Sequence, residues 1–436
     1  MQTILEAATA IRERRITPVD LVEMCFTNID LWEPHVHAWV FVDRDGARAE
    51  AKRLTDELNA GRYRGPLHGI PIGIKDIFDV FDWPTAAGSK LWANAIARED
   101  CEVVKRLRAA GAIFLGKTVT TQYASFDPPV TRNPWNFART PGGSSSGSAA
   151  AVSTLMCLGA MGSQTGGSIT RPATYCGVAG IKPSYGLVPL QGIMPLAPSM
   201  DHPGPIGRCV RDLTILLQVI AAPIKPSQVA ATSDGPEAPL LGRVRGLFDD
   251  LAAPAVRQAM EETQSKLVRA GAIVNEISLP ARFGEVIARH RVIMAVEAAA
   301  FHETRLAKHP NDYLPRIRSL LEEGLACPAP EYARCQEHQY QLSADMAACF
   351  AEADVLIMPA TTCPAPDGAT TGDPAFNSPW SYTGLPAVSF PTGQFVDGLP
   401  LALQLVGAKG SEAELLSVAQ WCEKALGAQP LTPKQP

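Results

Sequence analysis

The chain has 436 residues, of which 46% are hydrophobic and 19% are charged. A chain of this size buries roughly three quarters of the surface that its unfolded form exposes, so a large core is expected. The net charge of −5 does not favour nucleic acid as a partner. No apolar run reaches the ~18 residues that a membrane span needs, and the charged N-terminus lacks the apolar core of a signal peptide. The composition therefore predicts a soluble, cytoplasmic protein without membrane contact.

The ten cysteines are scattered and form no C-x-x-C pair. Several stand in apolar runs, as Cys157 does. This pattern favours buried free thiols in a reducing compartment over five disulfides. No metal and no cofactor is expected.

Residues 1 to about 60 are predicted as helices. Thr17 is placed to cap the second helix, with Pro18 at its first position. A third helix is expected over 44–58. The segment 67–80 then reads as a buried strand and turn, and Lys75 comes at the strand's end.

A helix is predicted over 101–110, followed by Gly111 as its cap and a short buried strand over 112–115. The sequence of 111–118 also fits the phosphate-loop pattern G-x-x-x-x-G-K-[ST]. That pattern requires a strand before the first glycine and a loop inside it, whereas here a helix precedes and strand-forming residues follow. Nucleotide binding is therefore not predicted.

The rest of the chain alternates between strands and helices. Expected are strands and ordered loops over 174–210, a helix over 211–221, a surface segment over 223–239, a mainly helical part over 247–349 with a strand at 272–277, strands over 354–359, 387–391 and 401–406, and a helix over 411–426. This alternation predicts an α/β layered fold.

The stretch from Thr140 to Thr170 contains no charged residue. Two Gly/Ser clusters, 142–148 and 162–168, are joined by a small and apolar run over 149–160. A flexible linker would have polar flanks, and these flanks are apolar. We therefore interpret the clusters as two walls of one catalytic site, held in register by a buried element.

These parts can supply acyl-transfer chemistry. A serine attacks an acyl carbon well only when a base removes its proton, and a lysine can serve if burial keeps it neutral. Lys75 has that setting. Gly166, Gly167 and Ser168 offer consecutive backbone N–H groups that can hold an oxyanion.

A second serine pattern leaves an alternative open. Residues 143–147 fit G-x-S-x-G, the nucleophile elbow of α/β hydrolases, which would make Ser145 the nucleophile. The elbow needs a preceding strand, and 136–142 reads as loop. The later histidines stand in no recognisable triad setting and are expected on the surface or on helix faces: His202, His290, His302, His309 and His338.

Most of the chain resembles the amidase signature enzymes. The matching segments, in order, are GIPIGIKD (69–76), GAIFLGKT (111–118), RNPWN (132–136), RTPGGSSSGSAAAV (139–152), GSQTGGSITRPA (162–173), CGVAGIKPSYG (176–186), SMDHPGP (199–205) and GLPLALQLVG (398–407). The resemblance implies a Ser–Ser–Lys triad: Ser168 as nucleophile, Ser144 as proton relay after a cis peptide bond, and Lys75 as base.

The resemblance also implies an oxyanion hole from the backbone at Thr165, Gly166, Gly167 and Ser168. It implies one domain, 1–436, with a central mixed β-sheet flanked by helices on both faces. Within it, 1–60 would be N-terminal helices, 61–222 the catalytic core, 240–349 a mainly helical part, and 350–436 the strands and helix that complete the sheet. The resemblance suggests a homodimer.

Departures from the commoner family pattern point to a subgroup. The pattern S-D-T-G-G-S-I-R is replaced here by Gln164 at the Asp position, Thr170 at the Arg position, and an arginine at Arg171. This version is similar to the malonamidase-like branch, in which that arginine binds the carboxylate of a small half-amide, and 371–380 suits that branch too. Arg171, with Gly143, is thus expected to contact substrate. A protein carboxylate could instead pair with Arg171, because an unpaired buried cation is costly.

The predicted function is hydrolysis of the C–N bond of a small amide, with a free carboxylate on the substrate as a candidate feature. Two alternatives within the enzymes remain. They are the glutaminase-type subunit of a tRNA-dependent amidotransferase, which would need partner subunits, and a His-triad α/β hydrolase. A non-catalytic binding protein is the alternative of a different class.

Overall fold

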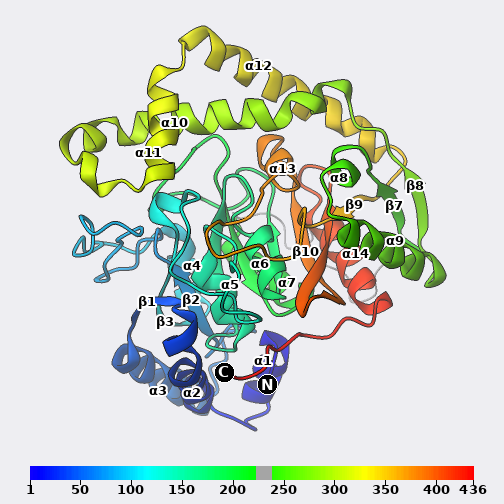
Figure 1. Ribbon diagram of the computed structural model, residues 1–436. Coiled ribbons are helices and arrows are strands. Elements are labelled where there is room, and N and C mark those ends of the chain that lie inside the picture. Colours follow the sequence, from blue (N-terminus) through cyan, green and yellow to red (C-terminus); the bar gives the residue numbers. More distant parts are fainter. Residues whose placement is uncertain (222–237) are drawn as a thin grey trace.

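The computed structural model describes residues 1–221 and 238–436. In this part of the chain, eleven strands form one sheet in the order β1-β3-β2-β4-β6-β5-β10-β11-β9-β7-β8 (Figure 1). The strands are β1 (Trp39–Val42), β2 (Pro71–Lys75), β3 (Ile113–Thr118), β4 (Gly159–Gln164), β5 (Ala179–Lys182), β6 (His202–Gly207), β7 (Leu240–Arg243), β8 (Ile273–Glu276), β9 (Val355–Pro359), β10 (Ala387–Val396) and β11 (Leu399–Val406). The sheet is mixed, as predicted: β2 runs parallel to β3 and β4, whereas β10 and β11 are antiparallel. Nearly all of the surface segment predicted at 223–239 lies outside the described residues.

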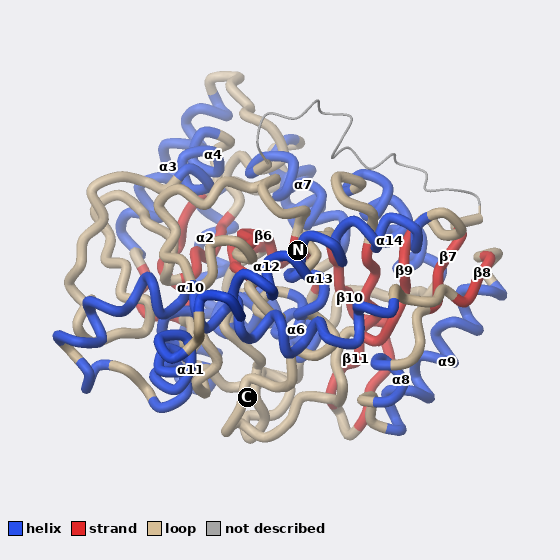
Figure 2. The backbone as a smooth tube through the Cα atoms, turned by 90° about the horizontal axis from the view of Figure 1, so that it is seen from above, coloured by secondary structure: helices blue, strands red, loops and turns tan. Residues whose placement is uncertain are grey.

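Helices surround this sheet. They are α1 (Ile4–Arg12), α2 (Pro18–Val36), α3 (Arg44–Asn59), α4 (Glu102–Ala109), α5 (Ser146–Ser153), α6 (Thr170–Cys176), α7 (Val210–Ile220), α8 (Leu247–Asp250), α9 (Pro254–Arg269), α10 (Val286–Lys308), α11 (Pro315–Ala326), α12 (Ala329–Asp345), α13 (Ser378–Tyr382) and α14 (Glu412–Ala425), with 3₁₀ turns η1 (Gln122–Ala124), η3 (Ala281–Glu285), η4 (Pro310–Asp312) and η5 (Met346–Phe350). Helices α7 and α14 lie on one side of the central strands and α6 on the other (Figure 2). Helices α10, α11 and α12 form a layer beyond one end of the sheet (Figure 1). Among the described residues, no helix is both long and apolar enough to cross a bilayer.

The N-terminal region contains the helices that the sequence predicts and one strand that it does not. Thr17 caps α2 with a reciprocal capping box to Asp20, as expected from Thr17-Pro18. The prediction of helices throughout 1–60 is wrong at β1, which pairs antiparallel with the edge of β3. Its four residues are too few for a helix and gain their hydrogen bonds only from that tertiary pairing.

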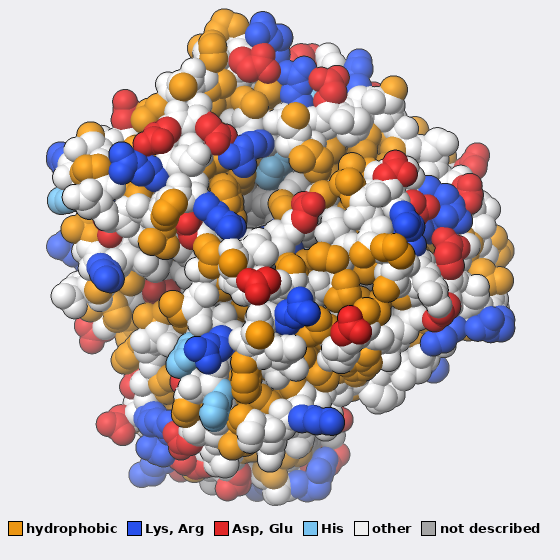
Figure 3. All heavy atoms as spheres, viewed as in Figure 1, with side chains coloured by type: hydrophobic (Ala, Val, Ile, Leu, Met, Phe, Trp, Pro, Cys, Tyr) orange, Lys and Arg blue, Asp and Glu red, His pale blue; other side chains and the backbone are white. Residues whose placement is uncertain are grey.

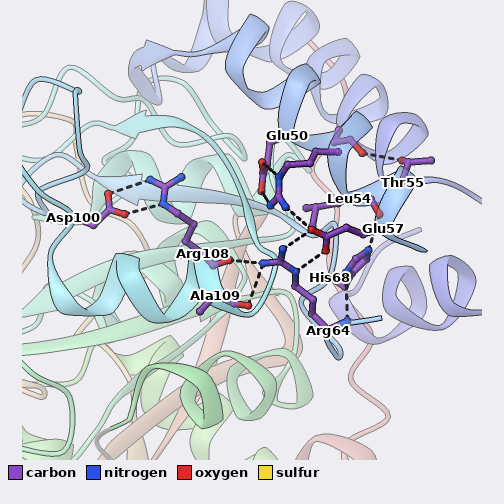
Figure 4. Close-up of polar contacts among 11 residues, drawn as sticks. Glu50, Leu54, Thr55, Glu57, Arg64, His68, Asp100, Arg108 and Ala109 are labelled. Atoms are coloured by element: carbon purple, nitrogen blue, oxygen red, sulfur yellow. Dashed lines mark hydrogen bonds and ion pairs between the residues drawn. The ribbon is translucent and has the colours of Figure 1, made fainter. Parts of the chain in front are cut away.

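Arg64 fixes the chain before β2 by joining α3 to the end of α4 (Figure 4). Its guanidinium donates to Glu57 at 2.6 and 2.8 Å and to two carbonyl oxygens at the C-terminal end of α4 at 3.4 and 3.5 Å. The His68 ring lies 3.0 Å from the Leu54 carbonyl oxygen. Because these contacts tie both flanking helices to the segment entering β2, they help to hold the strand that ends in Lys75.

The uncharged stretch forms the centre of the molecule. It contains α5 and β4, which are buried along almost their whole length. Gly147 lets α5 approach the neighbouring backbone closely, because a Cβ atom there would lie 2.2 Å from the Ala38 carbonyl oxygen and 2.4 Å from the Val119 nitrogen. The apolar run thus holds the two Gly/Ser clusters in place, as the sequence indicates.

Candidate active site

Lys75 lies at the end of β2, between β3 and β4, and its side chain is fully buried. The parallel register pairs Ile74 with Met161, so the end of β2 meets the second Gly/Ser cluster. Lys75 Nζ lies 2.7 Å from Ser144 Oγ and 2.8 Å from Ser163 Oγ. The strand end therefore brings one amine to both Gly/Ser clusters.

The surroundings of Lys75 favour its neutral form. Burial lowers the pKa of Lys75 well below its ordinary value, and the more distant Asp201 opposes this only in part. Within the described residues no carboxylate lies within salt-bridge distance of Nζ. A neutral amine can donate to Ser163 and still accept the hydrogen of the Ser144 hydroxyl. The arrangement is that of a base held beside a serine.

The peptide bond between Gly143 and Ser144 is cis. The Gly143 carbonyl oxygen accepts a hydrogen bond of 2.9 Å from Arg171 Nη2. The Ser144 carbonyl oxygen accepts one of 3.2 Å from the Thr121 nitrogen. Both carbonyl groups that flank the serine are therefore anchored, and its hydroxyl is directed toward Lys75.

Ser168 lies in a loop whose backbone is held by its carbonyl groups. The carbonyl oxygens of Thr165, Gly166, Gly167 and Ser168 accept from His290 Nε2, Ser381 Oγ, the Arg171 nitrogen and the Ser145 nitrogen, at 2.9, 3.2, 3.0 and 3.3 Å respectively. Within the described chain, the N–H groups of Gly166, Gly167 and Ser168 donate to no protein acceptor. The loop thus keeps donors available, as an oxyanion hole requires.

The Ser168 hydroxyl itself has no hydrogen-bond partner among the described residues, and the residue is 7% exposed. The structure therefore brings Lys75 and Ser144 into direct contact and places Ser168 on the adjoining loop.

Three supporting residues were not singled out from the sequence. Ser163 is the second partner of Lys75, and its place in the second Gly/Ser cluster was the available signal. Asp201 accepts from the Thr165 hydroxyl and from the backbone at Leu196 and Ala197, which secures the start of the loop. His290, from α10, holds the Thr165 carbonyl group. No local pattern could find these last two contacts, because their partners lie far apart in the sequence.

The altered motif residue Gln164 has a local structural role. Its Oε1 accepts from the backbone of Ile169 and Thr170 at 2.9 and 3.0 Å and from the Thr170 hydroxyl at 3.2 Å. These contacts close the turn that leads from the Ser168 loop into α6. The replacement of Asp by Gln thus leaves the turn fully bonded.

A cavity of about 620 Å³ opens in front of this loop. Its wall includes the backbone of 165–168, Arg171 and residues from α8, α10 and the segment 370–378. Figure 3 shows a hollow in the face below α10, with hydrophobic, basic and histidine side chains around it. Cavities of roughly 300–1,000 Å³ commonly hold drug-sized ligands, so this one exceeds the needs of a small half-amide.

Arg171 lies at the floor of this cavity and is 3% exposed. Its Nη2 contacts Gly143 and, at 3.3 Å, the Thr371 hydroxyl, whereas Nε and Nη1 have no hydrogen-bond partner within the described chain. Burial lowers the pKa of Arg171, and the charge of Asp373 counteracts this without forming an ion pair. The sequence left two candidate partners for Arg171, a substrate carboxylate and a protein carboxylate. Among the described residues, no protein carboxylate lies within ion-pair distance of Arg171.

The histidines were expected on the surface or on helix faces. His202 is buried on strand β6, so this expectation is wrong for His202. His290 and His302 lie on helix α10, with buried side chains. Burial lowers the pKa of His290 and of His302 to about 4. Ser145 is bonded to the backbone of Ser163 at 3.3 Å and to no histidine. The segment before Ser145 is loop, so the nucleophile elbow is absent from this site.

The cysteines agree with the sequence-based interpretation. All ten are free, and seven of them are buried. The phosphate-loop pattern also has the expected form, since α4 precedes Gly111 and strand β3 follows it.

Comparison with known proteins gives one result along the whole chain. Residues 20–416 match the family model described as Amidase. The chain is 34% identical to one subunit of the glutamyl-tRNA(Gln) amidotransferase of Geobacillus thermodenitrificans, over 97% of both chains. It superposes on a crystallised amidase with a TM-score of 0.89 and 33% identity, covering 97% of this chain and 99% of that one. The chain superposes on the native peptide amidase of Stenotrophomonas maltophilia with a TM-score of 0.83 and 27% identity, covering 99% of this chain and 98% of that one.

Fold, site and relatives together define an enzyme that hydrolyses amide bonds. The protein belongs to the amidase signature family, as its motifs indicated.

Proposed function

We propose that the protein hydrolyses carboxamides through an acyl-enzyme on Ser168, with Ser144 as proton relay and Lys75 as base. The observation that carries this proposal is the 2.7 Å contact between the buried Lys75 Nζ and Ser144 Oγ. A lysine kept neutral by burial can take up the Ser144 proton. The free N–H groups of 166–168 would stabilise the negative charge that develops on the substrate oxygen.

In the proposed reaction, Ser168 Oγ bonds to the amide carbon while its proton passes to Ser144, and the Ser144 proton passes to Lys75. The C–N bond then breaks as a proton returns through Ser144 to the leaving nitrogen. Water next attacks the Ser168 ester, releases a carboxylic acid and restores the serine. Each proton taken up by Lys75 in one half-reaction is returned within it.

The test compares two neighbouring serines. Ser168→Ala should lower kcat/KM for amide hydrolysis at least about 10³-fold, because the attacking oxygen is lost. Ser145→Ala is the matched control and should stay within about tenfold, since its hydroxyl bonds only to the backbone of Ser163. A fluorophosphonate that labels Ser145 would favour the α/β-hydrolase alternative. Labelling of no serine, together with no turnover, would favour a binding protein.

We further propose that Arg171 receives a carboxylate of the substrate. Its guanidinium lies at the cavity floor with Nε and Nη1 unpaired among the described residues. Buried charges in proteins are normally paired, so a substrate anion would complete its hydrogen bonds. Its contact with Gly143 offers a second role, in which it positions the peptide bond next to Ser144.

A glutaminase-type role is the second candidate, favoured by the 34% identity to an amidotransferase subunit. Glutamine would then be the preferred amide, and the ammonia would pass to a partner protein. The measurement is turnover of glutamine against simple alkanamides by the purified chain, with co-purification from its native source. A strong preference for glutamine and a stable partner would support this role over the first.

A further inference from the structure

The lining of the cavity beside Ser168 contains two chemically different groups of residues. The loop 165–168, Arg171 and Thr371 present polar groups. The lining also contains an apolar group, which comprises Leu196, Leu247, Leu251, Ile287, Ala288 and Met294. Three polar side chains, His290, Arg291 and Arg316, line the cavity as well. Because the apolar side chains offer no acid, base or hydrogen bond, none of them serves the proposed chemistry.

The apolar side chains lie on elements that carry none of the proposed triad residues. Leu247 belongs to α8 and Leu251 follows it, whereas Ile287 and Met294 lie on α10. Neither helix contributes a hydrogen bond to Lys75, Ser144 or Ser168. These apolar side chains can therefore vary without removing a hydrogen bond of the proposed triad, although α10 also holds the Thr165 carbonyl group through His290. We call this group of apolar side chains the specificity wall.

Part of this wall is open to solvent. Leu251 is 48% exposed, and Leu247 and Ile287 are only partly buried against the core. Water that covers apolar side chains in a concave site is displaced favourably by an apolar ligand. The cavity volume of about 620 Å³ leaves room for such a group beyond the amide itself.

We propose that this wall is a subsite for an apolar alkyl or arylalkyl substituent of the amide substrate. The inference rests on the proposed amide hydrolysis for the identity of the reacting group, and it refines the small half-amide expected from the sequence. It holds whether Arg171 meets a substrate carboxylate or only the Gly143 carbonyl group. The substrate class is an amide with a sizeable apolar group, attached on either the acyl or the nitrogen side.

Affinity measurements on the Ser168→Ala variant test the subsite without turnover. The probes are the straight-chain alkanamides from acetamide to hexanamide and the N-alkylacetamides of equal length. In one of the two series, affinity should rise by up to about fourfold for each methylene added, as expected for burial of that group. The series that shows the rise identifies the side of the amide that faces the wall. Equal affinity along both series overturns the proposal.

A pair of variants locates the effect. Leu251→Asn should reduce the ratio of hexanamide to acetamide affinity, or the corresponding N-alkyl ratio, at least threefold. Leu325→Asn is the matched control, because Leu325 on α11 is 50% exposed and lies outside the cavity lining. Its ratio should equal that of the parent. The same ratio in all three proteins contradicts the assignment of Leu251 to the subsite.

The two proposals fail separately. A rise in affinity with chain length, combined with no hydrolysis of any amide by the wild-type protein, leaves the subsite standing and rejects the proposed reaction. If acetamide and the longer amides of both series are hydrolysed equally well and bind with equal affinity, the proposed reaction stands and the subsite is rejected.

Discussion

In the proposed mechanism, the charge state of Lys75 Nζ decides whether this nitrogen can act as the base. Burial lowers its pKa, so the neutral form is reached at a lower pH than for an exposed lysine. The base must be neutral to accept the Ser144 proton. Activity should therefore be fully present above the pKa of Lys75 in the folded protein and fall about tenfold for each pH unit below it. A profile of kcat/KM against pH on a neutral amide, whose own charge does not change, measures this.

Replacing Lys75 separates its role as a base from its role as a space-filling residue. Lys75→Arg keeps a long cationic side chain that stays protonated, and Lys75→Met keeps the length without a nitrogen. Both should lower kcat/KM by about 10²–10⁴-fold at every pH, because neither can accept the proton. Circular dichroism and thermal melting check that each variant folds. Retention of more than a tenth of the activity by either folded variant would remove Lys75 from the mechanism.

Arg171 has two candidate tasks that kinetics can distinguish. Against a half-amide such as succinamate, Arg171→Met should lower kcat/KM by about 10²–10³-fold, because one partner of a buried charge pair is lost. Against butyramide, which is similar in size but neutral, the loss should be at least tenfold smaller. Arg171→Lys keeps the charge but loses the bidentate donor geometry of arginine, so its kcat/KM for the half-amide should lie between those of the parent and of Arg171→Met. Equal losses on both substrates would assign Arg171 to positioning Gly143 instead.

At the residue scale, the sequence was informative where chemistry depends on local order. Lys75 could be placed because it ends an apolar strand, and the serines because they lie in glycine-rich clusters free of charge. The contacts that make them a site are tertiary. Asp201 reaches Thr165 from 36 residues away and His290 reaches it from 125 residues away, so no spacing in the sequence connects them. The prediction failed for His202 because residue type alone does not reveal that its ring is buried against the Met200 carbonyl group.

At the element scale, a buried acidic group joins α14 to α7. Glu423 accepts from the Val210 nitrogen at 3.2 and 3.3 Å. Burial, with help from the neighbouring Asp212, raises the pKa of Glu423 to about 7. A raised pKa in the folded state means that the folded protein binds this proton more tightly than the unfolded chain. The associated stability is present below the ordinary pKa of about 4.5 and is lost as pH rises through about 7.

The substitution Glu423→Gln should therefore stabilise the folded protein, relative to the parent, increasingly as the pH rises. The variant keeps an oxygen for Val210 but cannot ionise. Its free energy of unfolding, relative to the parent, should increase by roughly 1–3 kcal/mol between pH 4.5 and pH 8. Urea denaturation at both pH values measures this, with Glu322→Gln on the exposed face of α11 as control. A difference that does not change with pH would show that folding leaves the pKa of Glu423 unchanged.

Long helices were predictable because their capping residues and periodic apolar faces are local signals. Some strands that form the site could not be recognised from their own sequence. Strand β4 has the sequence GAMGSQ, which contains no β-branched residue, yet it is paired on both sides and fully buried. Pairing with β2 and β6 overrides its low strand propensity. The order of strands in the sheet also lay beyond reach, because it is set by which surfaces pack together rather than by any one segment.

At the scale of the whole molecule, the two halves of the chain contribute different parts of the candidate site. The strands and loops up to Arg171 supply the groups that we propose to react, whereas α8, α10 and the segment 370–378 supply much of the remaining cavity lining. His290 and Ser381 reach back from the second half to hold the loop of Ser168. Both halves of the chain therefore contribute residues to the candidate site.

The proposed mechanism makes a prediction about assembly. Every group proposed to act in the reaction, from Lys75 to Ser168, and every residue lining the cavity belongs to the same chain. Activity per molecule should therefore stay constant as the protein is diluted from micromolar to nanomolar concentration, whether or not the chain forms a homodimer. Sedimentation over the same range reports the oligomeric state independently. If activity falls on dilution in step with dissociation and returns when a second copy or a co-purified partner is restored, an assembled partner must shape the site, and the glutaminase-type role gains over independent amide hydrolysis.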